Sequence, residues 1–209
     1  TASDNAEEQV ETEIKAQQEA KEEVKELQKK EAIINELSQT SETDSTKLSA
    51  AAENAKTEFG EFYNNLSGTE EKITLENNLV SIEISNKGAQ INKVELKEFL
   101  TWEKKPLNLI DNSHSLNLTL ATKSKPKGLD LENLFFDVEK ISDNSVSLKL
   151  KISDSQYLEQ IYSLTDDSYF VDFDINLVNL NSILLNPTNN IEANWKYKVL
   201  QQEKSLKFE

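Results

Sequence analysis

The apolar positions follow a helical spacing first and an alternating spacing later. From Glu7 to Leu37 the chain is rich in Glu, Lys, Gln and Ala and has no Gly or Pro, which predicts a helix. Its apolar positions are sparse, and Gln17 and Lys21 fall on the seam that a coiled coil needs apolar. This pattern predicts a solvated, partly helical spacer, with a helix that packs on a partner as the alternative.

A linker and a second helix follow this leader. Residues 38–47 are polar throughout and predict a linker. The stretch from Leu48 to Leu66 predicts a second helix that ends in the aromatic residues Phe59, Phe62 and Tyr63. Because these rings are spaced i, i+3 and i+4, we expect them to dock the helix onto the domain that follows.

From Ile73 onward, apolar and polar residues alternate, which is the pattern of β-strands with one wet face. The alternating runs are Leu79–Ser85, Ile91–Leu96, Leu116–Leu120, Val146–Ile152, Tyr169–Leu177 and Ile191–Val199. Asn86–Gly88, Asp143–Ser145 and Asp154–Ser155 predict turns, and Gly88 suits a position with positive φ. About ten short runs without helical crossovers predict a mainly β domain of antiparallel sheets packed as a sandwich.

The division into a polar leader and a β domain also appears in the composition. Residues 1–47 contain thirteen acidic residues, six lysines and no aromatic residue. Only the later part has enough apolar surface to offset the conformational entropy lost on folding. We therefore expect a charged, partly helical or disordered spacer at 1–57 and a β domain at 58–209.

Charge and residue usage exclude several classes of function. The net charge is -15 and all 23 basic residues are lysine, which argues against a nucleic-acid partner. Without cysteine there is no disulfide, thiolate nucleophile or cysteine-type zinc site. No apolar run approaches the length of a membrane-spanning helix. Because the chain begins at Thr1 and has no methionine, we expect it to be a fragment whose targeting or anchoring segment lies outside it.

The residues that could perform chemistry are few and isolated. His114 is the only histidine and lies in a polar turn, so we expect it to be exposed and not a general base or a metal ligand. The pair Asp166 and Asp167 lies where a hairpin turn is required and lacks the spacing of a calcium loop. Asp172 and Asp174 lie on the polar face of a strand, and we expect all four acids to be solvated.

Trp195 and Tyr197 share one face of the last predicted strand. Aromatic residues at inward strand positions usually belong to a core, which is the favoured interpretation, while a sugar-binding cleft is the alternative. No phosphate-binding loop, nucleophile elbow or zinc spacing is present. The sequence thus predicts no enzyme, no catalytic residue, no cofactor and no metal, and it identifies no binding residue.

Several stretches resemble one known family. The resemblance lies in Gly68–Val80, Ser85–Ile91, Val94–Lys97, Lys105–Leu107, Tyr157–Leu164, Asp167–Ile175, Asn194–Trp195 and Gln202–Lys204. Their order and spacing are similar to the large periplasmic domain of YidC/Oxa/Alb-type membrane protein insertases in the form of Bacteroidetes-like bacteria. Ala89 departs from this pattern, because the family often has a second glycine there.

The resemblance implies a β-supersandwich of twisted antiparallel sheets, similar to the galactose-mutarotase-like fold. It also implies a monomeric, non-catalytic domain at the periplasmic face of the bacterial inner membrane. Through the parent protein this domain would assist membrane protein insertion and folding beside the Sec translocon, with translocon components and nascent membrane proteins as partners. Since fold alone does not establish function, a carbohydrate-binding or sugar-modifying β-sandwich is the alternative.

Overall fold

The structure, a computed structural model, describes residues 21, 24–25, 28–35, 45–111, 114–186 and 191–204, without the side chains of 45–51. The chain divides into two compact units, Thr1–Glu58 and Phe59–Glu209. Much of the leader helix predicted from Glu7 to Leu37 lies outside the described residues, but the described part of it is helical.

The first unit contains the helix α2, Ser45–Phe59, except for its last residue. This helix begins three residues before the predicted Leu48, so the end of the linker predicted at 38–47 is helical instead. Polar composition suggested a linker there, but a helix tolerates polar residues as long as Gly and Pro are absent. Within this unit the Lys29 ammonium pairs with the Glu58 carboxylate, and Ile33 is buried.

A 3-10 helix, η1 (Gly60–Leu66), opens the second unit and packs against strand β8 (Ser145–Ser153). Of the three rings predicted to dock, Phe59 and Phe62 are buried within the second unit and Tyr63 is half-buried. Gly60 has a φ of +59°, a conformation in which a residue with a Cβ is strained. The chain can therefore leave the geometry of α2 at this point and begin the tighter turn of η1.

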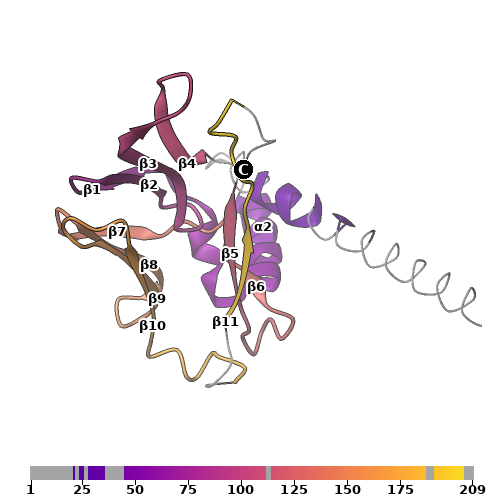
Figure 1. The fold of residues 1–209 in the computed structure, drawn as a ribbon. Coiled ribbons are helices and arrows are strands. Elements are labelled where there is room, and N and C mark those ends of the chain that lie inside the picture. The colour runs from indigo at the N-terminus through magenta and orange to yellow at the C-terminus, as the bar shows by residue number, and fades with distance from the viewer. Residues whose placement is uncertain are drawn as a thin grey trace, which may run out of the picture. The chain divides into compact units, whose positions relative to one another are not determined.

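The described residues of the second unit form eleven strands in three antiparallel sheets (Figure 1). The first sheet has the order β1-β2-β3-β4. Its strands are β1 Lys72–Glu76, β2 Val80–Ser85, β3 Gln90–Leu100 and β4 Pro106–Asp111. The predicted turn at Asn86–Gly88 joins β2 to β3, and Gly88 has a φ of +68° as expected.

The second sheet has the order β10-β9-β8-β7. Its strands are β7 Asp137–Ser142, β8 Ser145–Ser153, β9 Gln156–Leu164 and β10 Val171–Val178. The predicted turns at 143–145 and 154–155 flank β8, which confirms the alternating run from Val146 to Ile152 as a strand. In β10 the acidic residues face outward as predicted, while the apolar residues between them are only half-buried.

The third sheet has the order β11-β5-β6. Its strands are β5 Ser115–Leu120, β6 Leu129–Asp130 and β11 Ile191–Lys196. Strand β11 pairs with β5 over its whole length, from Ile191 opposite Leu120 to Lys196 opposite Ser115. It ends three residues before the predicted Val199.

Two asparagines and one tyrosine join neighbouring segments across the sheets. The Asn77 amide, after β1, donates 2.8 Å hydrogen bonds to the carbonyls of Thr165 and Ser168, between β9 and β10. Its side-chain oxygen accepts the backbone N–H groups of Leu79 and Val80. Both ends of this side chain are therefore used, and the turn after β1 is fixed to the turn after β9.

Asn86 holds the end of β2 in the same way. Its amide donates to the carbonyls of Thr69 and Phe136, at 3.1 and 3.3 Å, and its side-chain oxygen accepts the Glu71 N–H at 2.8 Å. Asn86 itself is buried, so each of these bonds satisfies a polar group that water cannot reach. From β9, the Tyr162 hydroxyl donates to the Ala89 carbonyl over 2.7 Å.

The core of this unit lies along the inward faces of the strands. Its fully buried side chains include Phe62, Leu75, Ile82, Ile84, Leu120, Leu131, Leu134, Phe136, Leu148, Leu150, Leu158 and Tyr162. The mainly β, antiparallel class predicted from the sequence is confirmed. The described residues form three sheets and do not show these closing into a supersandwich.

Candidate interaction surfaces

His114 lies directly before β5 and differs from the exposed residue that its polar neighbours suggested. It is half-buried, and its Nδ1 atom is shielded from solvent without a hydrogen-bond partner among the described residues. Burial lowers the pKa of the imidazole, because the charged form is poorly solvated there. Within the described ranges, no three His, Cys, Asp or Glu side chains gather as metal ligands. His114 is thus a partly shielded, neutral side chain.

The acidic pair of the β9–β10 turn is exposed, as predicted. Each of its carboxylates also braces a neighbouring turn. Asp166 accepts a 2.8 Å hydrogen bond from the Asn144 amide, and Asp167 accepts one of 2.9 Å from Asn78. These acids therefore hold turns together. Asp172 and Asp174, on β10, are exposed as well.

Trp195 and Tyr197 are not part of the core, which corrects the favoured interpretation. They are 65% and 47% exposed, and their ring centroids lie 6.2 Å apart at an angle of 53°. The reason is that β11 is an edge strand whose side chains are exposed along almost its whole length. The Tyr197 hydroxyl donates to the Leu109 carbonyl at 3.1 Å, which orients this ring toward β4.

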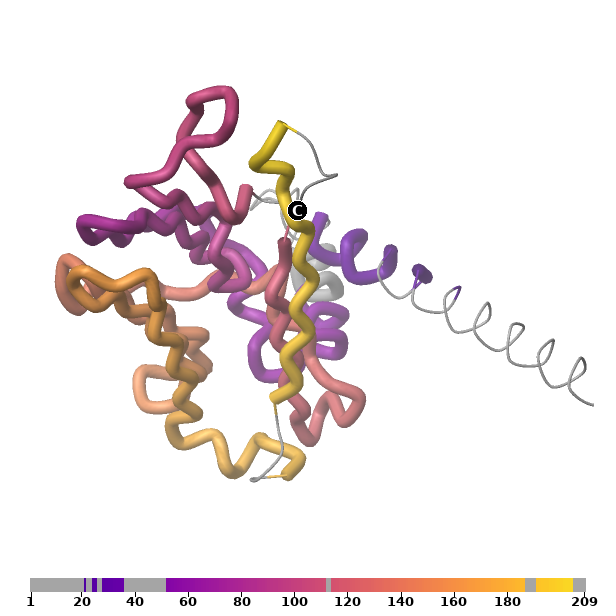
Figure 2. The backbone as a smooth tube through the Cα atoms, in the orientation of Figure 1, coloured from indigo at the N-terminus to yellow at the C-terminus, as the bar shows by residue number. Residues whose placement is uncertain are grey.

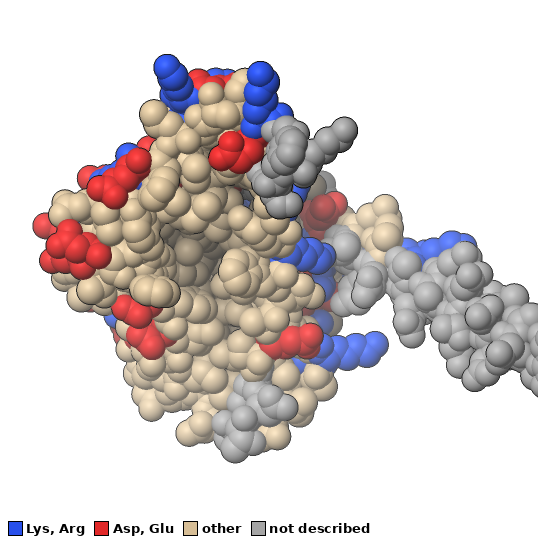
Figure 3. Space-filling model, in the orientation of Figure 1, with Lys and Arg blue, Asp and Glu red and all other residues tan. Residues whose placement is uncertain are grey.

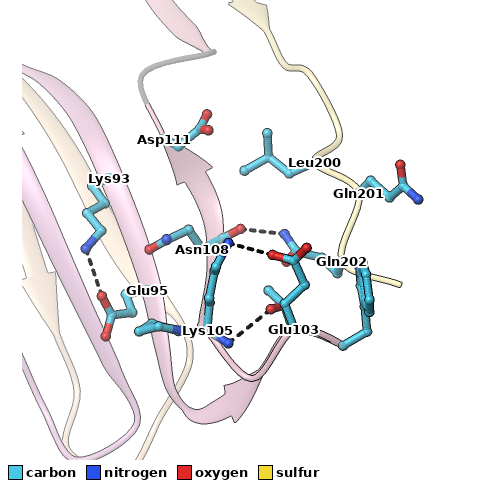
Figure 4. A pocket seen from close by; sticks show the side chains of 12 residues that line it. Lys93, Glu95, Glu103, Lys105, Asn108, Asp111, Leu200, Gln201 and Gln202 are labelled. Atoms are coloured by element: carbon cyan, nitrogen blue, oxygen red, sulfur yellow. Dashed lines mark hydrogen bonds and ion pairs between the residues drawn. The ribbon is translucent and has the colours of Figure 1, made fainter. Parts of the chain in front are cut away.

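A cavity of about 510 Å³ lies between the β3–β4 hairpin and the segment 200–202 (Figure 4). The Lys93 ammonium lies 2.8 Å from the Glu95 carboxylate and the Lys105 ammonium 2.6 Å from Glu103, so these charges neutralise one another. The Asn108 side-chain oxygen is shielded and has no partner among the described residues. The Asp111 carboxylate also lines the cavity, so its wall contains two lysine–glutamate pairs and one further acid.

A second cavity, of about 600 Å³, lies beside the end of η1 and the chain that leaves it. Its wall is mainly polar and includes Asn64, Ser67 and Thr69. The charged residues Asp137 and Lys151 also line it and pair with each other at 2.9 Å. Asn86 also lines this cavity, but both ends of its amide already bond to backbone groups. Its role is therefore to stabilise the fold.

The space-filling view shows a hollow in the second unit, lined mainly by uncharged side chains (Figure 3). In this orientation it lies among the first sheet, the strands β8–β10 and the pair β5–β11, with acidic side chains toward its rim. The half-buried apolar residues of β10 show that one face of the second sheet is incompletely covered. A surface of this kind is more typical of a site that binds another polypeptide than of a catalytic site.

The β3–β4 hairpin has an exposed apolar end that the strand periodicity did not single out. Phe99, Leu100 and Trp102 are 48%, 60% and 51% exposed. The Phe99 ring lies 6.3 Å from the ring of Tyr169 in the β9–β10 turn. A tryptophan and a leucine beside Lys104 and Lys105, between two strand signals, were the available signal in the sequence.

Comparisons with known proteins place these features in a family context. The family model described as the YidC periplasmic domain matches residues 72–209. A protein of Parabacteroides distasonis named membrane protein insertase YidC is 36% identical over 163 residues, which are 77% of this chain and 26% of that protein. No solved structure matches the chain significantly.

More distant relatives carry the same name. The protein of Chlorobaculum parvum is 31% identical over 179 residues, 81% of this chain and 30% of the relative. The protein of Phocaeicola vulgatus is 30% identical over 148 residues, which are 71% of this chain and 24% of that protein. The chain thus spans about a quarter to a third of the length of these relatives. Along the described residues, no helix is long and apolar enough to cross a membrane.

Proposed function

Because this chain belongs to the family of YidC periplasmic domains, we propose that it assists membrane protein insertion and folding as the non-catalytic periplasmic part of an insertase beside the Sec translocon. The observation that carries the proposal is the family match over 72–209, which includes all three sheets. The family is not one of enzymes, and its domain is periplasmic, in agreement with the predictions from the sequence.

We infer nascent membrane proteins and Sec translocon components as the partners. The hollowed, mainly uncharged face of the second unit supports this inference, because it offers contact area to polypeptide and little to polyanions (Figure 3). The net charge of -15 also disfavours nucleic acid. The domain acts as a monomer in this proposal, which analytical ultracentrifugation of the chain would test.

The proposal assigns the segments 1–57 and 58–209 to different tasks. The first is a charged spacer that sets the distance of the second, a β domain, from its attachment. The absence of aromatic residues before Phe59 supports this division, because such a chain buries little apolar surface. In limited proteolysis, cleavage should be confined to the segment before residue 58, and a protected leader would contradict the division.

We further propose that the three sheets are parts of a β-supersandwich of the galactose-mutarotase-like kind. The half-buried apolar residues of β10 and the exposed Trp195 ring of β11 support this, because both strands present apolar side chains that a facing sheet would cover. A crystal structure of the periplasmic region of the parent protein tests it. Sheets that remain separate there would contradict it.

The experiment for the main proposal is a gene replacement in a strain whose insertase can be depleted. The parent protein would carry a deletion of 59–209, and protease protection of a newly made membrane protein would report insertion. We expect slower insertion with the deletion and site-specific crosslinks between the intact domain and Sec components. Normal insertion together with no crosslink from any surface position would refute the proposal.

A carbohydrate-binding sandwich is the second candidate, and the exposed pair Trp195 and Tyr197 favours it. Exposed rings can stack on a sugar, but neither ring lines the two cavities described above. A glycan array probed with the wild-type chain and Trp195→Ala would decide. Binding that is lost in the variant would support this candidate, and no binding would remove it.

A further inference from the structure

The β3–β4 hairpin extends beyond the rest of its sheet. The register of β2 with β3 ends at Val80 opposite Leu96, and the Lys97 N–H still donates to the Leu79 carbonyl at 2.8 Å, so residues 98–100 pair on that side with no strand. Farther out, Leu100 pairs only with Pro106 across the hairpin. Figure 2 shows this hairpin projecting at the top of the view, apart from the other strands.

The projecting end is held in place from two sides. The backbone N–H of Trp102 donates to the Gln202 carbonyl at 3.2 Å. The side-chain amide of Gln202 donates to the Asn108 carbonyl at 2.6 Å. On the other side, Tyr169 contacts the Phe99 ring and donates to the Glu98 carboxylate at 3.2 Å. An isolated two-stranded hairpin is marginally stable, so these contacts are what make the projection a defined element.

The end of the hairpin combines exposed apolar and basic side chains, and we name it the hairpin tip: Phe99, Leu100, Trp102, Lys104 and Lys105. Lys104 has a φ of +62°, in the tight turn of the tip. Lysine side chains protrude at the top of the view, where this hairpin ends, with acidic side chains between them (Figure 3). Glu103 follows Trp102 in this turn and pairs with the Lys105 ammonium at 2.6 Å, so Lys104 is the basic side chain that the tip offers to a partner.

This combination matches the chemistry of a bilayer surface. Tryptophan is enriched at the level of the lipid headgroups, aliphatic side chains such as leucine enter the acyl boundary, and lysine reaches the phosphates. A peptide ligand that adds as a strand would find only the short stretch 98–100 of β3 unpaired on its β2 side, which is less than an ordinary strand. The edge of β4 is partly occupied, because Tyr197 and Gln202 bond to its carbonyls at Leu109 and Asn108.

We propose that the hairpin tip docks into the headgroup region of the membrane, with Leu100 and Trp102 entering and Lys104 facing the phosphates of anionic phospholipids. The contact fixes the orientation of the second unit over the bilayer. It rests on the proposed role of the domain at the inner membrane. A weak contact suffices there, because attachment of the parent protein raises the effective concentration of the tip at the surface.

The two tryptophans provide a matched test. The chain would be tethered through an N-terminal hexahistidine tag to phosphatidylethanolamine–phosphatidylglycerol vesicles that contain a nickel-chelating lipid and brominated acyl chains. Trp195→Phe leaves Trp102 as the only indole, and Trp102→Phe leaves Trp195, which is 65% exposed. We expect Trp102 fluorescence to shift to the blue and its quenching to exceed that of Trp195 by about twofold or more.

A second pair of variants tests the tip without altering the reporter. In the Trp195→Phe background, Leu100→Glu should abolish the quenching of Trp102. Leu185→Glu, at another exposed leucine, should leave it unchanged, and circular dichroism checks the fold of both. Equal quenching of the two tryptophans, or quenching that survives Leu100→Glu, would overturn the proposal. The proposal would also be overturned if adding an unfolded apolar peptide shifted the Trp102 emission to the blue while adding vesicles did not. These outcomes concern the isolated chain, so the gene replacement still tests the proposed function separately.

Discussion

The Tyr162 hydroxyl donates a 2.7 Å hydrogen bond to the Ala89 carbonyl, joining β9 to the turn between β2 and β3 across 73 positions of the sequence. Both residues are buried, at 2% and 1% exposure. The phenol also lies 3.4 Å from the Gln160 side-chain oxygen, and its ring stacks on Phe173 with centroids 4.7 Å apart.

Removing this hydroxyl should therefore destabilise the domain. Tyr162→Phe keeps the ring and its stacking but leaves a buried carbonyl without a donor, which costs about 1–3 kcal/mol. Urea denaturation followed by tryptophan fluorescence measures the loss. Tyr157→Phe, at a half-buried tyrosine of the same strand, is the control and should change the free energy of unfolding much less. Equal effects of the two variants would contradict the prediction.

Gly88 should tolerate no side chain. Its φ of +68° disfavours any other residue, and a Cβ there would lie 2.6 Å from the backbone oxygen of Glu132. Gly88→Ala should lower the free energy of unfolding by about 2 kcal/mol or more, because backbone cannot move aside as a flexible side chain can. The midpoint of thermal unfolding measures it. A variant as stable as wild type would show that this turn has a different conformation.

Glu159 should stabilise the second sheet as a carboxylate. Burial opposes its ionisation, but hydrogen bonds from Ser147 and Asn176 and the charge of Lys149 prevail and lower its pKa. Since the folded pKa lies below that of the unfolded chain, this stabilisation is present at neutral pH and is lost as the pH falls below about 4.5.

Glu159→Gln is the matching variant. It removes the negative charge that Lys149 and the hydrogen bonds from Ser147 and Asn176 stabilise, and should cost about 1–2 kcal/mol at pH 7. Denaturant unfolding at pH 7 and at pH 3 should show that the difference from wild type shrinks on acidification. A difference that is constant between the two pH values would refute the stabilising role of the charge.

His114 also makes the stability depend on pH, but through a base that is neutral when folded at pH 7 and not through an acid that is charged. Because burial lowers its pKa, the unfolded chain binds a proton at higher pH than the folded chain does. The contribution of this group to stability is complete above the usual value of 6.5 and decreases as the pH falls through the folded pKa. As the chain has one histidine, its imidazole signals in proton NMR report the titration directly. A midpoint at or above 6.5 would contradict the shielding seen here.

Alternation in the sequence located several strands but was an incomplete guide to them. The alternation of Val146 to Ile152 located β8, because apolar side chains of this strand are buried along one face. Strand β7, Asp137–Ser142, has almost only exposed side chains and gave no periodic signal. The same limit explains the error at Trp195, where alternation predicted a core but β11 lies at an edge. Alternation shows that a strand has two faces, but not that something covers one of them.

The surfaces were harder to predict than the fold. The resemblance to the periplasmic domain family came from turns and strands, and the family match over 72–209 confirms it. It could not indicate the hairpin tip, because the exposure of Leu100 and Trp102 depends on how far β3 runs past β2. That length depends on the register of three strands, which no short sequence pattern specifies.

Asn77 and Asn86 have a consequence for how this domain can change over evolutionary time. Each uses its side chain to bond to backbone groups of distant segments, at Thr165 and Ser168 in one case and at Thr69, Glu71 and Phe136 in the other. Backbone groups are the same whatever the side chain, so mutations at the receiving positions leave these bonds intact. The constraint therefore falls on two asparagines alone, and the turns that they hold are free to diverge in sequence while the sheets keep their arrangement.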